Sequence, residues 1–216
     1  GGPSRVTARA SVGRKGVVNI ERDVAMGGPI QQKAAMILQG YFTGAFARRM
    51  PLSFTASITF EQNYGGVEGD SATLAEAVAI ASDLSGLPVR QDIAITGSMN
   101  QAGFAQSVGG VHHKIEGFFR ACREAGPLTG TQGCIAPASN ADQILLDHDV
   151  VAAIAAGDFH VWTVDRLADA LELMLGAPAG ERDADGNYPP DSVFGRIQAT
   201  LEGFNRELLR AERLLD

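Results

Sequence analysis

Positive charge, long apolar runs and cysteine are all scarce in this sequence. The 18 Lys and Arg residues are outnumbered by 25 Asp and Glu, which gives a net charge of −7. Such a surface repels phosphate backbones, so we expect no nucleic-acid partner. Apolar stretches such as residues 150–156 are too short to cross a bilayer, which predicts no membrane segment. Cys122 and Cys134 lack C-x-x-C spacing, which favours two reduced thiols over a disulfide, a metal site or a redox site.

Signals for export, nucleotide binding and metal binding are missing from the sequence as well. Residues 1–11 have no apolar core of the kind that a signal peptide needs, so we expect a cytoplasmic protein. Because the sequence starts without Met, we expect a fragment or a processed chain. No G-x-x-x-x-G-K-[ST] loop and no cluster with metal-ligand spacing occurs in the sequence. We therefore predict neither a cofactor nor a metal for this chain.

The 216 residues are enough for one sizeable domain, or for a large and a small one. Hydrophobic periodicity predicts strands at residues 5–11, 16–20, 53–60, 89–97, 104–108, 132–137 and 159–164. It predicts helices at residues 30–48, 71–85, 111–125, 149–157 and 166–175. We expect the first two strands to pair antiparallel, and 104–108 to pair with 89–97. The irregular order favours an α+β domain with mixed β-sheets and packed helices.

The C-terminal part of the sequence suggests a division of the chain. Residues 177–192 are polar and rich in Pro and Gly, which is typical of a linker or an exposed loop. Residues 193–215 carry apolar side chains at helical spacing, and Asp191 or Ser192 can cap this helix. We therefore predict a domain over 1–176, a loop over 177–192 and a helical extension over 193–216. The helix could pack on its own domain or on a neighbouring chain.

Ser71 and Lys114 are the strongest candidates for chemistry. Ser71 lies in the segment EGDSA, at a Gly-rich turn into a helix, and Lys114 ends the segment GGVHHK. A Ser hydroxyl needs a base, and a Lys serves only when neutral, although its ordinary pKa is about 10.4. Apolar neighbours such as Ile115 and Phe118, together with the positive end of the helix dipole, both lower that pKa. The pair predicts a hydrolase with a Ser nucleophile and a Lys base.

The turn before Ser71 also suits acyl transfer. The first N–H groups of a helix lack internal partners, and Gly65, Gly66 and Gly69 let the backbone come close to a substrate. Spacing alone favours a structural interpretation, in which Asp70 or Ser71 caps the helix and Lys114 is a solvated helix residue. A Ser/His esterase is less favoured, because the sequence around Ser71 is not G-x-S-x-G.

The wider order of motifs resembles the proteolytic domain of Lon proteases, especially the archaeal-type branch. The resemblance runs over roughly residues 5–175, through TARASVGRKGVVNIER, ITFEQNYGGVEGDSA, LSGLPVRQDIAITGSMNQAGFAQSVGGVHHKIEGFFRA and APASN. The order GDSA, then TG, then GGVxxK is specific to that family. It implies the Lon proteolytic fold and a serine peptidase with a Ser-Lys dyad.

The resemblance implies a role for each matching residue. Ser71 would be the nucleophile, Lys114 the general base, and Thr96 a residue that orients the Lys. Glu68 would contact Lys114 and, as an anion, raise its pKa and oppose activation. The backbone amides beside Ser71, in the segment that holds Gly69, Asp70 and Ala72, would bind the oxyanion. Gly109 and Gly110 would let their turn pass close to the cleft.

Some features depart from the family pattern. Asp70 and Ser98 stand where many bacterial members have Pro and Glu, which fits the archaeal-type branch. His112 and His113 are less expected, and we interpret them as surface or interface residues. The family implies a six-membered ring, polypeptide substrates and an ATPase motor that binds ATP and Mg, which this sequence lacks. Without the motor we expect cleavage of accessible or unfolded polypeptide only. A non-catalytic oligomerisation or substrate-holding module with the same fold is the alternative.

Overall fold

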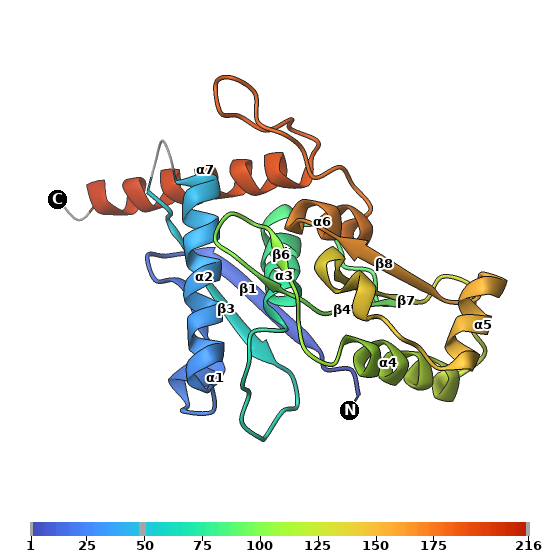
Figure 1. Ribbon diagram of the computed structural model, residues 1–216. Helices are drawn as coiled ribbons and strands as arrows, with labels where there is room; N and C mark the ends of the chain where they lie inside the picture. Colours follow the sequence, from blue (N-terminus) through green and yellow to red (C-terminus); the bar gives the residue numbers. More distant parts are fainter. Residues whose placement is uncertain (1, 48–50, 215–216) are drawn as a thin grey trace.

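The computed structural model describes residues 2–47 and 51–214 (Figure 1). Its strands are β1 (Val6–Val12), β2 (Gly16–Asn19), β3 (Phe54–Phe60), β4 (Ile93–Ile95), β5 (Ser98–Met99), β6 (Ala105–Gln106), β7 (Gly133–Pro137) and β8 (His160–Val164). Its helices are α1 (Ile20–Asp23), α2 (Pro29–Phe46), α3 (Thr73–Ser85), α4 (Val111–Ala125), the 3-10 helix η1 (Ala138–Gln143), α5 (His148–Ala156), α6 (Leu167–Leu175) and α7 (Val193–Arg213). Within these residues the strands form three small sheets. The predicted mixed sheets with packed helices are thereby confirmed.

The first sheet has the order β1-β3-β2. β3 pairs antiparallel with β1, where Val6 lies opposite Phe60, and parallel with β2 on its other side. The expected antiparallel pairing of the first two strands is therefore wrong. Their connection crosses the start of β3, where Gly13 N donates to Ser53 O (3.2 Å) and Lys15 N donates to Thr55 Oγ1 (3.2 Å). In this order β3 is the central strand and pairs along both of its edges. Its side chains are buried at alternate positions.

The second sheet has the order β4-β7-β8, with all strands parallel and β7 buried along its whole length. β4 is shorter than the predicted strand 89–97, because the backbone N–H of Arg90 donates to Met174 O (2.9 Å), outside the sheet. The predicted partner of β4 is also wrong. β6 pairs antiparallel with β5 in a separate two-stranded sheet, with Met99 opposite Ala105.

Helix α3 lies at the centre of the molecule, in contact with β1, α6 and α7. It carries Leu74, Ile80 and Leu84 into the main core, all of them buried. The first half of α7 joins the same core through Val193 and Ile197. The predicted terminal helix therefore packs on its own chain along this half.

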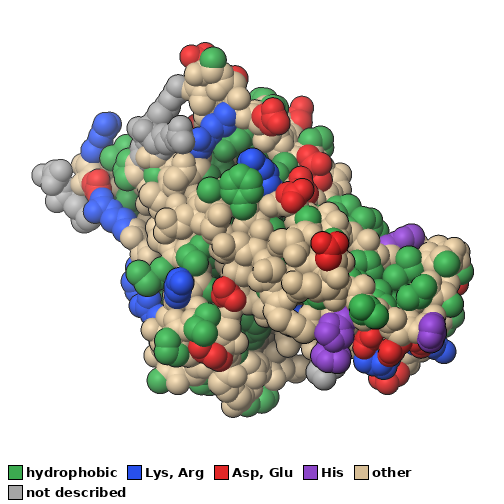
Figure 2. Space-filling model, in the orientation of Figure 1, with side chains coloured by type: hydrophobic (Ala, Val, Ile, Leu, Met, Phe, Trp, Pro, Cys, Tyr) green, Lys and Arg blue, Asp and Glu red, His purple; other side chains and the backbone are tan. Residues whose placement is uncertain are grey.

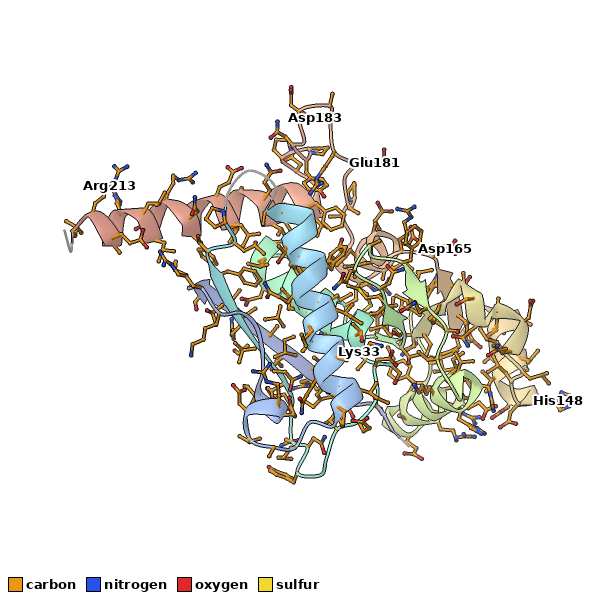
Figure 3. All side chains as sticks on the ribbon, turned by 60° about the vertical axis from the view of Figure 1, so that its left-hand side comes forward. Lys33, His148, Asp165, Glu181, Asp183 and Arg213 are labelled. Atoms are coloured by element: carbon orange, nitrogen blue, oxygen red, sulfur yellow. The ribbon has the colours of Figure 1, made fainter. Side chains whose placement is uncertain are left out.

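The loop between α6 and α7 is fixed at both ends. Val193 N donates to Pro178 O (2.9 Å), and Ser192 Oγ accepts from Gly195 N (3.0 Å) and so caps α7. The middle of the loop projects from the body, and its Glu181 and Asp183 point outwards (Figure 3).

The predicted ends of the helices at 48 and 215 lie outside the described residues. No helix of the described part is long and apolar enough to span a membrane.

Acidic and basic side chains are both present on the face shown in Figure 2. They are interspersed there, and the basic ones do not form a continuous stripe across this face. This distribution accords with the low proportion of basic residues in the sequence.

Candidate active site

Ser71 lies in the turn immediately before α3, and its side chain is partly buried. The N-cap of α3 is Ala72, and no side chain caps the helix there. The Thr73 hydroxyl closes the turn by donating to Asp70 O (2.6 Å). The interpretation of Ser71 as a helix cap is therefore wrong. Its hydroxyl is not used to hold the helix.

Gly97, between β4 and β5, holds the backbone of Ser71 in place. Gly97 N donates to Ser71 O (2.8 Å), and Leu74 N donates to Gly97 O (3.0 Å). A Cβ on Gly97 would clash with the Leu74 side chain and lie 3.1 Å from Pro137 Cγ. Any other residue here would force its neighbours to shift. The sequence pointed to this glycine only through the TG step in the motif.

Thr96 connects the two candidate catalytic residues. Lys114 Nζ donates to Thr96 Oγ1 (3.2 Å), and Thr96 Oγ1 donates to Ser71 O (3.2 Å). Lys114 is in the first turn of α4, which starts after Gly110 in the left-handed conformation (φ 64°). The side chains of Ser71 and Lys114 make no direct hydrogen bond among the described residues. The structure thus brings Ser71, Thr96 and Lys114 together around one cleft of about 400 Å³.

The electrostatics at Lys114 combine two opposed effects. Partial burial at the edge of the cleft lowers the pKa of Lys114, and the nearby charge of Asp70 acts against this. Asp70 is held by Ser98, whose Oγ donates to Asp70 Oδ2 (2.8 Å). The net direction is downwards, towards a neutral amine. Desolvation, which the apolar neighbours of Lys114 in the sequence suggested, is the dominant cause.

Glu68 has a different partner from the one that the family pattern implied. Its Oε1 accepts from Ile30 N (3.2 Å) at the start of α2. No ion pair between Glu68 and Lys114 occurs in the described part of the chain. The carboxylate whose charge acts on Lys114 is Asp70, two residues closer to Ser71.

The backbone around Ser71 presents free donors. Neither Ser71 N nor Ala72 N has a hydrogen-bond acceptor among residues 2–47 and 51–214, which leaves both for a substrate oxygen. Gly69 enters the turn with φ 98°, a conformation that side-chain-bearing residues rarely adopt. Gly109, in contrast, faces open space and has no such requirement.

The cleft walls are mostly apolar, and apart from Phe118 and Ile115 they include residues that the sequence did not indicate. Ala75, Ile95 and Phe118 line it, and so do His113 and Cys134. Burial raises the pKa of the Cys134 thiol to about 12, so this sulfur stays protonated and does not compete as a nucleophile. No group of three metal-ligating side chains lies within the described ranges.

The fold and this cleft correspond to a known class of protein. A sequence profile of the Lon protease (S16) C-terminal proteolytic domain matches residues 64–177, a stretch that contains Ser71, Thr96 and Lys114. This match covers more than half of the chain, and the chain belongs to the Lon S16 proteolytic-domain family.

Curated relatives agree with this assignment. A Lon protease homolog of Escherichia coli (strain K12) is 44% identical over 175 residues, which are 81% of this chain and 30% of the relative. A homolog of Haemophilus influenzae is 39% identical over 203 residues, 94% of this chain and 34% of the relative. The archaeal Lon protease of Archaeoglobus fulgidus is 39% identical over 118 residues, 55% of this chain and 17% of that protein. The chain thus spans about a third of the length of the first two relatives.

Proposed function

We propose that this domain is a serine peptidase in which Ser71 is the nucleophile and Lys114 the general base. The observation that carries the proposal is the hydrogen-bonded connection from Lys114 Nζ through Thr96 Oγ1 to the Ser71 carbonyl. It fixes the amine beside the turn that bears the serine. Because Thr96 uses its hydroxyl proton on Ser71 O, it accepts from the Lys and leaves the amine lone pair for the Ser71 hydroxyl.

The reaction then follows from the positions of these groups. Neutral Lys114 takes the Ser71 Oγ proton as the oxygen attacks the carbonyl carbon of a peptide bond. The negative charge that develops on the carbonyl oxygen is stabilised by N–H groups near Ser71 and Ala72. Protonated Lys114 returns the proton to the leaving amine, and water hydrolyses the acyl-enzyme with the same residue as base. Partial burial of Lys114 supports the first step, because it favours the neutral amine.

The substrate of the domain is polypeptide in accessible or unfolded form. The family is fed by an ATPase motor that uses ATP and Mg, and we place that activity in the part of the protein outside this chain. We extend to this protein the six-membered ring of the family, which encloses the active sites, and a cytoplasmic location. We do not expect the domain to unfold a stable protein by itself, because its sequence contains no G-x-x-x-x-G-K-[ST] loop.

The test compares three variants on a fluorogenic peptide. Ser71→Ala and Lys114→Ala should each abolish cleavage, whereas Lys33→Ala, at an exposed position of α2, should leave it unchanged (Figure 3). Full activity in Lys114→Ala would overturn the mechanism, because Ala cannot accept the proton.

A boronate or fluorophosphonate probe separates catalysis from the alternative function. We expect it to label Ser71 in the wild-type chain. A folded wild-type protein that the probe does not label would favour a non-catalytic oligomerisation or substrate-holding module.

A further inference from the structure

A single buried side chain, that of Asn140, holds the segment that leads into α4. Asn140 lies in η1, which directly follows β7, and it is 0% exposed. Its Oδ1 accepts from Val108 N (2.9 Å), and its Nδ2 donates to Val108 O (3.0 Å). Val108 belongs to neither a strand nor a helix, so no sheet ladder satisfies these two backbone groups. The amide of Asn140 therefore pairs with Val108 as a neighbouring strand would.

Val108 belongs to the same packed unit as the first turns of α4, which carry Lys114. Val108, Val111 and Ile115 lie in one buried apolar cluster. The turn between Val108 and the helix consists of two glycines, residues 109–110, which offer no side chain that could fix it. The backbone entering α4 is thus fixed from outside the turn, and Asn140 supplies both of the hydrogen bonds that fix it at Val108.

Strand β7 is a common reference for the two ends of Lys114. At the tip, Lys114 Nζ donates to Thr96 Oγ1 (3.2 Å), and Thr96 N donates to Ile135 O of β7 (3.0 Å). At the helix start, Asn140 follows the end of the same strand and binds the chain before α4. A shift of α4 relative to β7 would therefore move the amine away from Thr96.

We propose that Asn140 is a positioning residue for peptide cleavage, which acts through Val108 to hold the start of α4 and thereby Lys114 at the cleft. The proposal rests on the proposed peptidase function and adds to it a residue from a different segment. Asn140 does not line the cleft, so its effect on the reaction is indirect. The Asn stands in the segment APASN, for which the dyad itself provides no role.

Loss of this clamp should change the pH dependence of the reaction as well as its rate. Burial lowers the pKa of Lys114, so a loosened α4 that lets the amine reach water raises it again. The titratable groups that face Lys114 are Asp70, whose charge acts on it, and His113 and Cys134 in the cleft wall. None of these three is bound by Asn140. The rising limb of kcat/KM against pH should therefore move to higher pH.

The experiment compares Asn140→Ala with Gln143→Ala on a fluorogenic peptide. The exposed Gln143 accepts from the same Asn140 Nδ2 (3.0 Å), so its truncation is a matched control that leaves both bonds to Val108. We expect Asn140→Ala to lower kcat by about 10- to 100-fold with KM little changed, the effect of a small misplacement of a catalytic group. Its rising limb should move to higher pH, whereas Gln143→Ala should keep the wild-type values. Rates are compared per folded protein, with the fluorescence of Trp162 as the measure of folding.

Asn140→Asp is a second variant that decides the matter if the alanine variant does not fold. Its side chain has the size of Asn, and burial favours the protonated acid. In that form one oxygen accepts from Val108 N and the O–H donates to Val108 O, so both bonds persist. The ionised form loses the donor. The kcat of this variant relative to the wild-type chain should therefore be higher at pH 6 than at pH 9.

Two results would overturn the proposal. One is a folded Asn140→Ala protein with wild-type kcat and an unmoved limb. The other is a relative kcat of Asn140→Asp that is the same at pH 6 and pH 9. In both cases the wild-type chain and Gln143→Ala still cleave the peptide. A failure of the proposed peptidase function, by contrast, would leave the wild-type chain itself inactive.

Discussion

The Nζ atom of Lys114 and the Oγ1 atom of Thr96 lie 3.2 Å apart, and the same hydroxyl also binds the backbone of Ser71. A single side chain thus links Lys114, the proposed base, to the turn that bears Ser71, the proposed nucleophile. Lys114 comes from α4 and Ser71 from the turn before α3, so their distance depends on an intermediary. Thr96, the residue directly after β4, is this intermediary, because it binds both Lys114 and the Ser71 backbone.

Thr96→Val tests this connection, because Val keeps the shape of the side chain and removes the hydroxyl. We expect kcat to fall by about 10²-fold, since a small misplacement of a catalytic group has an effect of that order. Thr96→Ser should recover most of the activity. The measurement is kcat and KM on a fluorogenic peptide, together with the unfolding midpoint of each variant. A Val variant with wild-type kcat would show that Thr96 does not position the base.

Asp70→Asn tests the opposed charge at Lys114. The Asp70 carboxylate stabilises the ammonium and so holds the pKa of Lys114 higher than burial alone would. Removing that charge lowers the pKa, so a larger fraction of Lys114 is neutral at a given pH. The rising limb of kcat/KM against pH should therefore move to lower pH. The control is Ser98→Ala, which keeps the charge but removes the hydrogen bond to Asp70. A limb that does not move, or moves to higher pH, would contradict the assignment of this limb to Lys114.

Local signals predicted the longer helices well, whereas the short helices α1 and η1 were not predicted. α4 has the predicted bounds, because the apolar spacing and the flanking glycines Gly110 and Gly126 act within a few residues. Strand order could not be predicted in this way. The insertion of β3 between β1 and β2 depends on which face of the sheet the whole chain buries, a non-local property.

The same contrast between local signals and long-range contacts applies to the candidate site. Ser71, Thr96 and Lys114 could be found from the order of their motifs. The hydrogen bond of Glu68 to α2 and the position of His113 in the cleft arise from contacts between distant segments. Nothing in the local sequence distinguishes His113 from His112.

Glu76 on α3 predicts a pH dependence of stability. It is fully buried, and its Oε1 accepts from Gln31 Nε2 (2.6 Å). Burial, helped by the nearby charge of Glu21, raises its pKa from 4.5 to about 7. A carboxyl with a raised folded-state pKa stabilises the fold fully below the unfolded value. This contribution is lost as the pH rises through the folded value.

The free energy of unfolding should therefore fall between pH 4.5 and 7, by about 3 kcal/mol from this group alone. Glu76→Gln should remove that part of the slope and be more stable than the wild-type chain at pH 8. Urea unfolding at pH 5 and pH 8 measures the difference. Parallel slopes in the two proteins would refute the contribution of Glu76.

Gly97→Ala tests the clamp on the Ser71 backbone. The new methyl group would meet Leu74 and Pro137, so α3 or β4 must shift. We expect a loss of about 1–3 kcal/mol in the free energy of unfolding. We also expect a fall in kcat greater than that loss explains, because Gly97 N binds Ser71 O (2.8 Å). Gly109→Ala is the matched control, since a Cβ there meets open space and the residue lies just before α4. Activity and unfolding measured at one temperature decide the matter. Equal activity in the two variants would mean that the position of the Ser71 turn does not depend on the close approach of β4.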